Sequence, residues 1–166
     1  MLKTLGVCAA LLSPNNLLSA EQVGRWEVLS PDHTLWDDGL EGAALVLDDD
    51  SYAMMLLRPD GQDALISIAY PGTPGQSQLK SSLEMPDGTV RQLTVNGDNL
   101  ISLPSPYDGF AAYAFILDKV DFELVQAGLR WRLTTATEQV VFPLKGSRIA
   151  IEKALALRTE DNAADS

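Results

Sequence analysis

Two stretches of the sequence hold the side chains that come closest to catalytic or metal-binding groups. His33 is the only histidine, and it lies in a Pro-Asp-His-Thr stretch without a Gly-X-Ser-X-Gly motif to supply a nucleophile. Asp48, Asp49 and Asp50 could offer oxygen ligands to calcium. However, consecutive residues of an extended chain point to opposite faces, and no downstream glycine and glutamate complete a calcium loop. We therefore interpret His33 as a loop residue and predict a solvated turn, with no metal and no cofactor.

A third stretch combines cations with an aromatic side chain. Arg130 and Arg132 flank Trp131, and the surrounding residues alternate between apolar and polar. This period of two predicts a strand in which Leu129, Trp131 and Leu133 face inward and the two arginines face outward. The arginines could meet an acidic partner, or they could offset the acidic surface of the protein itself.

The remaining acidic residues give no argument for catalysis. With 23 aspartates and glutamates in the chain, some pair of carboxylates must exist, whereas glycoside hydrolysis needs a set separation across a cleft. The Pro-Gly-Thr-Pro-Gly stretch at residues 71–75 lacks the lysine and the strand–helix context of a phosphate-binding loop. We therefore expect no enzyme.

The balance of charge excludes one class of partner. The 166 residues include 12 lysines and arginines against 23 acids, which gives a formal net charge of −11. Nucleic-acid affinity rests on neutralising phosphates, and an acidic surface repels them. We expect neither nucleic-acid binding nor docking to an anionic membrane. The acidic surface is compatible with a basic protein as the partner.

Residues 1–20 have the pattern of a secretory signal. Lys3 precedes an apolar run, Leu5 to Leu12, and Ala20 supplies the small residue at the cleavage point. The run is too short to span a bilayer. We expect cleavage after Ala20 and a periplasmic or secreted protein, which would lose Cys8 and with it any disulfide or thiolate site.

Residues 21–157 read as one β-rich domain. Hydrophobic residues make up 46% of the chain, enough for a core without metal or disulfide. Short alternating or apolar runs, separated by turns rich in proline and glycine, predict antiparallel strands. The expected strands are 24–30, 43–47, 52–58, 64–70, 79–85, 89–95, 100–103 and 110–117. Residues 158–166 are polar without periodicity and predict a disordered acidic tail.

A helix is expected after the last of these strands. Asp118 can cap its first turn, because a carboxylate accepts hydrogen bonds from the free N–H groups there. Val120, Leu124 and Ala127 then share one face, which we expect to be buried. Gly128 is expected to end the helix in the left-handed conformation.

A hairpin and a second helix follow. The alternation predicts strands at 129–134 and 139–144, with Val140, Phe142 and Leu144 on one side. Ser147 is the expected N-cap of the last helix. The apolar face of that helix is expected to hold Ile151, Ala154, Leu155 and Arg158, with Ile149 beside it.

This order of elements resembles the C-terminal half of the invasion-associated locus B family of secreted proteobacterial proteins. Trp26-Glu27-Val28 is also similar to the tryptophan strand with which that family opens. The resemblance implies a secreted, mainly β fold with a role at the cell envelope or host surface, and it brings no catalytic residues. The residues that carry it are Leu117, Leu124, Ala127-Gly128, Val140 to Leu144, Lys145-Gly146 and the helix from Ile149 to Leu155.

These observations lead to one expectation for the fold and three for the function. The fold is expected to be mainly β, an antiparallel sandwich or barrel-like domain with two short α-helices in its C-terminal third. The leading function is a non-enzymatic binding module of the envelope, with another envelope or extracellular protein as its partner. The candidate contact residues are Asp48, Asp49, Asp50, Arg130 and Arg132.

The alternative is an acidic inhibitor or immunity-type protein that blocks a basic enzyme such as a lysozyme. An inhibitor is expected to present one protruding acidic loop, for which Leu47 to Ser51 is the candidate. A general binding module is expected to present a concave apolar face. A third class, an acid-dependent hydrolase, needs two carboxylates that converge in a pocket.

Overall fold

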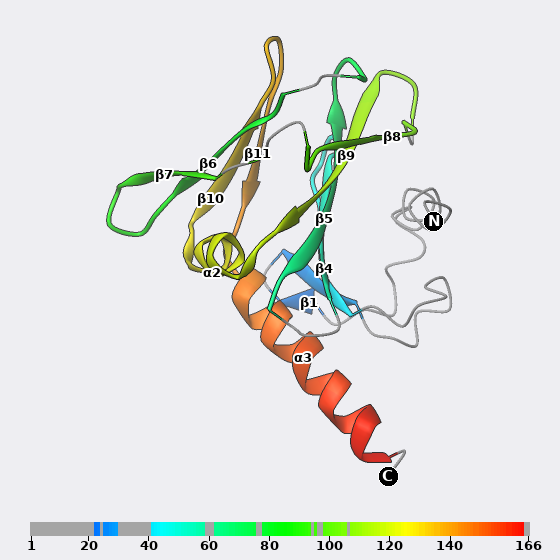
Figure 1. Cartoon of the computed structure of the whole chain (residues 1–166), viewed down its shortest axis with the longest axis vertical. Coiled ribbons are helices and arrows are strands. Elements are labelled where there is room, and N and C mark those ends of the chain that lie inside the picture. Colours follow the sequence, from blue (N-terminus) through cyan, green and yellow to red (C-terminus); the bar gives the residue numbers. More distant parts are fainter. Residues whose placement is uncertain are drawn as a thin grey trace.

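The computed structural model describes residues 22–23, 25–29, 41–58, 62–75, 78–93, 95, 98–105 and 107–164. Across these residues the protein is mainly β, with two antiparallel sheets and two helices near the C-terminal end (Figure 1). The two sheets face each other across a shared core and do not close into a barrel. The predicted sandwich is confirmed, and the barrel-like alternative is not what forms.

The larger sheet has seven strands in the order β1-β2-β3-β4-β5-β9-β8, and every neighbouring pair is antiparallel. The three strands expected between residues 43 and 70 form, and consecutive strands pair as the meander β3-β4-β5. The strands are β1 (Gln22–Val23), β2 (Trp26–Leu29), β3 (Gly42–Val46), β4 (Tyr52–Leu57), β5 (Ala64–Pro71), β8 (Ile101–Leu103) and β9 (Phe110–Leu117).

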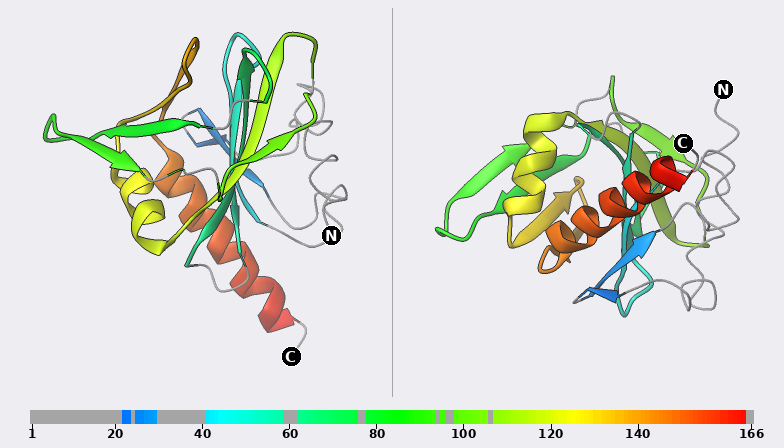
Figure 2. Two further views of the ribbon diagram at one scale, coloured as in Figure 1. Left: turned by 45° about the horizontal axis from the view of Figure 1, so that its top comes forward. Right: turned by 90° about the horizontal axis from the view of Figure 1, so that it is seen from below.

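The smaller sheet has four strands in the order β11-β10-β6-β7. They are β6 (Lys80–Glu84), β7 (Val90–Leu93), β10 (Arg130–Thr134) and β11 (Gln139–Pro143). The expected turn between β6 and β7 forms, with Gly88 at a φ of 83° and the Asp87 carboxylate accepting a hydrogen bond from the Thr89 amide at 2.9 Å. This hairpin projects from the body of the protein in every view (Figures 1 and 2).

The core fills the space between the two sheets. Trp131 from β10 meets Phe115 from β9 with ring centroids 5.9 Å apart and an interplanar angle of 81°, the edge-to-face geometry that aromatic pairs prefer. The indole N–H of Trp131 donates to the Ser81 hydroxyl at 2.8 Å, so the buried ring leaves no polar atom unpaired.

Strand β4 is buried on both faces, as its uninterrupted apolar sequence predicts. One face adds Ala53, Met55 and Leu57 to the core between the sheets. The other face contributes Tyr52, Met54 and Leu56 to a second apolar cluster, whose buried members all come from strands of the seven-stranded sheet.

Helix α2 (Lys119–Ala127) begins as expected and buries a different face. The Asp118 carboxylate accepts a hydrogen bond from the Asp121 amide at 2.9 Å, which confirms the N-cap. Phe122 and Val125 are the buried residues, whereas Val120 is 65% exposed. The prediction of an inward Val120 was wrong because the aromatic ring of Phe122, the largest apolar group of the helix, turns toward the core.

Gly128 serves close packing and not a left-handed turn. Its φ is −76°, an ordinary value, which contradicts the expected conformation. A Cβ at this position would lie 3.0 Å from Cδ1 of Leu144, so glycine lets the end of β11 approach the helix. The neighbouring Leu129, expected to face inward, is 46% exposed, while Trp131 and Leu133 are buried as predicted.

Helix α3 (Ser147–Ala164) is longer than the short helix expected, and it continues through most of the predicted tail. Ala150, Ile151 and Ala154 are buried, and Ile149 is 50% exposed. The Ser147 hydroxyl is buried and makes no hydrogen bond with the described residues, so the expected serine cap is not formed. The last turns extend beyond both sheets (Figure 1).

Candidate functional site

Asp48, Asp49 and Asp50 form the tight turn between β3 and β4, as predicted. The Leu47 amide donates to the Ser51 carbonyl at 2.7 Å, and Asp50 takes a positive φ of 65°. The Asp49 carboxylate accepts a hydrogen bond from the Ser51 amide at 3.0 Å. All three aspartates are exposed, so at least one of these carboxylates has a structural role in the turn and the others face solvent.

Arg130 and Arg132 lie on the outer face of the four-stranded sheet, again as predicted. Both are exposed, while Trp131 between them is fully buried. The inward ring fixes the register of β10, because a slip by one residue would exchange the two faces.

The order of the strands places further polar residues beside the arginines. Arg130 lies opposite Glu84, and Arg132 lies opposite Ser82. Ser82 in turn lies opposite Gln92 on β7. Residues that are directly opposite share a face, so these side chains form one polar surface across three strands. We call the outward residues Lys80, Ser82, Glu84, Gln92, Arg130 and Arg132 the arginine face.

A shallow depression of about 140 Å³ lies within the arginine face. One of its walls carries Arg130, whose guanidinium meets Glu84 with 3.4 Å between Nη1 and Oε2. Arg132 makes no ion pair with any residue that the structure describes. The lining residues are Ser82, Glu84, Gly88, Val90, Arg130 and Arg132.

The charge of the arginine face is opposite to that of the chain. It carries three cations, Lys80, Arg130 and Arg132, and one carboxylate, Glu84, in a chain whose formal net charge is −11. Lys80 lies diagonally across from Arg132, a position about 7–8 Å away, so these two cations lie within a Debye length of about 8–10 Å and reinforce one another's potential. The arginine face can therefore attract carboxylates, although most of the chain repels them.

A second depression, of about 270 Å³, lies between helices α2 and α3. Its lining contains one cation, Arg148, which is paired with Glu152 at 2.9 Å between Nε and Oε1. Glu123 adds another carboxylate, and Gln126 and Ala127 complete the lining. Its one cation is already paired and its remaining charge is a carboxylate, so this depression offers no unpaired cation to an acidic ligand and is the weaker candidate.

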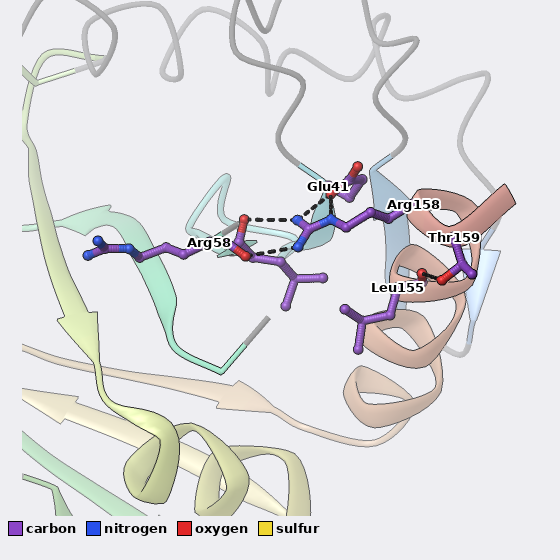
Figure 3. Close-up of polar contacts among 6 residues, drawn as sticks. Glu41, Arg58, Leu155, Arg158 and Thr159 are labelled. Atoms are coloured by element: carbon purple, nitrogen blue, oxygen red, sulfur yellow. Dashed lines mark hydrogen bonds and ion pairs between the residues drawn. The ribbon is translucent and has the colours of Figure 1, made fainter. Parts of the chain in front are cut away.

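Two clusters were not foreseen from the sequence, and the first joins Glu41 to Arg158 (Figure 3). The Arg158 guanidinium contacts the Glu41 carboxylate and donates through Nη1 to the Arg58 carbonyl at 2.9 Å and through Nη2 to the Leu57 carbonyl at 3.3 Å. Glu41 is 5% exposed. This cluster fastens helix α3 to the end of β4, which contradicts the prediction of a disordered tail from residue 158.

The second unforeseen cluster surrounds Glu138, in the turn between β10 and β11. The Thr135 hydroxyl donates to Oε2 of Glu138 at 2.7 Å, and the amide and hydroxyl of Thr73 each donate to Oε1 at 3.2 Å. These bonds, led by the one from Thr135 and supported by Thr137, hold the pKa of Glu138 below its usual value. The cluster joins the ends of the two sheets. The Glu138 carboxylate is already engaged by these hydrogen bonds within the protein.

Burial without a compensating partner marks one more site. The Tyr70 hydroxyl has no hydrogen-bond partner among the described residues, and its ring lies 6.2 Å from that of Tyr113. Burial first, and then the nearby Tyr113 and Glu138, raise the pKa of Tyr70 above its usual value. A phenol that stays neutral in this way is a poor general base at neutral pH.

Several predictions concern parts of the chain outside the described residues. These are His33, the expected signal at 1–20 and residues 165–166. In the described part, no three or more histidine, cysteine, aspartate or glutamate side chains are placed to hold a metal ion. No described helix has the length and apolar character needed to cross a membrane.

Comparisons with protein-family models, with curated proteins and with solved structures found no match. The candidate site therefore rests on the geometry of the chain itself.

Proposed function

We propose that the protein is a non-enzymatic binding module of the cell envelope, periplasmic or secreted, and that the arginine face binds an acidic segment of another envelope or extracellular protein. The observation that carries this proposal is the gathering of Lys80, Arg130 and Arg132 on one exposed sheet surface of a strongly acidic chain. The secretory pattern of residues 1–20 and the resemblance to the invasion-associated locus B family support the location.

Recognition by charge fits the described surface better than recognition by an apolar face. The exposed large apolar side chains lie on separate elements, and they are Val90, Ile101, Tyr107, Val120, Leu129 and Ile149. Val90 alone among these lines the depression beside the arginines. A surface of this kind gives specificity and association rate through electrostatic complementarity.

The test compares charge reversal on and off the arginine face. Binding of a short surface-coupled polyglutamate peptide is measured at low and at high salt for the wild type, R130E/R132E and K119E/K145E. Lys119 and Lys145 are exposed cations on other elements, so the control has the same net charge as the test variant. We expect R130E/R132E to lose at least about tenfold in affinity and the control to lose much less. Equal losses would contradict a localised site.

The acidic turn supports a second candidate, the inhibitor of a basic enzyme. Asp48, Asp49 and Asp50 are exposed at the end of a hairpin and pair with no described cation. Inhibition of a basic lysozyme by the wild type and by D48N/D49N/D50N tests this candidate. The asparagines keep the side-chain oxygen that Ser51 needs, so the turn is retained while the charge is removed. Absence of inhibition by the wild type excludes lysozyme as the target.

A further inference from the structure

The spacing of the two arginines matches the repeat of an extended ligand. Arg130 and Arg132 are alternate residues of β10, and alternate residues of a strand lie about 6.6–6.8 Å apart on one face. An extended segment that lies along β10 places its own alternate side chains at this same spacing. Adjacent residues of such a segment point in opposite directions, so only one of two adjacent acids could reach the arginines.

We propose that Arg130 and Arg132 of the arginine face each bind one of two carboxylates at alternate positions of an extended acidic segment. Glu84 of the protein itself competes with the ligand for Arg130. This inference rests on the function proposed above and names the ligand pattern. The occupant is a segment of a protein and not a nucleic acid, because a chain of net charge −11 repels a long polyanion far more than a segment with two acids.

Arg132 is the stronger of the two places. Its guanidinium forms no ion pair in the described part of the chain, and its planar fork can hold a carboxylate through two parallel hydrogen bonds. Ser82 lies directly opposite, and its hydroxyl has no hydrogen bond to the described residues. A carboxylate on Arg132 can therefore gain a third donor from Ser82.

Arg130 is the weaker place, because Glu84 already occupies part of it. The contact of 3.4 Å between Nη1 and Oε2 is longer than the 2.7–2.9 Å typical of charge-assisted bonds. The side chains of Arg130 and Glu84 are 62% and 38% exposed, so solvent screens the pair and an incoming carboxylate can exchange with it. Glu84 thus weakens binding at Arg130, so a ligand with a single acid gains only the Arg132 contact and the second acid of a longer segment must displace Glu84.

The experiment uses two peptides of one composition. In Thr-Glu-Thr-Glu-Thr the acids alternate, and in Thr-Thr-Glu-Glu-Thr they are adjacent. Amide chemical shifts of the full chain are followed during titration with each peptide at low ionic strength, for the wild type, E84Q, E123Q and R132E. Glu123 is an exposed acid on α2, so E123Q makes the same change of net charge away from the site.

We expect the wild type to bind the alternating peptide about fivefold more tightly, with shifts centred on Ser82, Arg130 and Arg132. E84Q is expected to gain about three- to fivefold in affinity for that peptide, E123Q to change little, and R132E to lose binding. Equal affinity for the two peptides, or equal gains in E84Q and E123Q, would overturn this inference and leave the proposed function standing if R132E still loses binding. Absence of binding to both peptides would overturn the inference. If R130E/R132E also binds polyglutamate as tightly as the wild type does, the proposed function is overturned as well.

Discussion

Two arginine–glutamate pairs of this molecule share their chemistry and differ in their surroundings. Arg158 and Glu41 are largely shielded, with side chains 20% and 6% exposed, and the guanidinium also holds the carbonyls of Leu57 and Arg58. The pair of Arg130 and Glu84 is open to solvent and rests on a single contact of 3.4 Å.

The neighbours of an ion pair therefore decide its role. A shielded pair whose three guanidinium nitrogens all donate cannot lose one partner without leaving an uncompensated charge, so it stabilises the fold that contains it. An exposed pair contributes little to stability and can exchange its partner. The first pair fastens helix α3 to β4, and the second lies on the surface that we propose binds an acidic segment.

Exchanging the two residues of each pair gives the largest expected contrast. In E41R/R158E, the carboxylate at position 158 would face the carbonyls of Leu57 and Arg58, which need donors. We expect a loss of about 3–5 kcal/mol in the free energy of unfolding, measured by urea denaturation. In E84R/R130E we expect a change within about 0.5 kcal/mol. Similar losses in the free energy of unfolding for both variants would contradict the different roles assigned to the two ion pairs.

Removing one charge from each pair gives a smaller contrast. E41Q leaves the Arg158 guanidinium without its carboxylate, and we expect a loss of about 2–3 kcal/mol in the free energy of unfolding. The identical substitution E84Q is expected to cost less than about 0.5 kcal/mol. Thermal and urea unfolding of both variants under the same conditions measure the difference. A stable E41Q would mean that the carbonyl contacts of Arg158 suffice.

Glu138 tests whether hydrogen bonds alone can give an exposed carboxylate a structural role. Its pKa is lowered in the folded protein, first by the Thr135 hydroxyl, so its stabilising effect is complete above the ordinary value of 4.5 and is lost as the pH falls through the lower folded value. Between about pH 5.5 and pH 3, the urea midpoint of the wild type should therefore fall more than that of E138Q. T135V should lie between the two, and identical pH profiles would show that the bonds contribute nothing.

Local patterns predicted the strands and the outward arginines. Alternation is a property of neighbouring residues, so Trp131 inward and Arg132 outward follow from the sequence alone. The residues opposite them do not, because nothing local places β6 beside β10. Ser82 and Glu84, which complete the arginine face, were missed for that reason.

The wrong predictions concern features that tertiary contacts with distant parts of the chain determine. The rotation of α2 depends on which of its apolar residues the core accepts, and Phe122 was preferred over Val120. The polar sequence after Leu157 lacks periodicity and reads as a tail. It is helical through Ala164, and Arg158 within it holds a partner 117 residues earlier in the chain.

One separation along the chain has a consequence for biosynthesis. The indole N–H of Trp26 donates to the Pro143 carbonyl at 2.9 Å, and this bond also spans 117 residues. A ribosome delivers the N-terminal strands first, and the groups that complete Trp26 and Glu41 emerge 117 residues after each of them. A polypeptide whose translation stops before residue 143 therefore lacks both the Trp26–Pro143 hydrogen bond and the Glu41–Arg158 ion pair. We expect proteases to degrade such a truncated polypeptide.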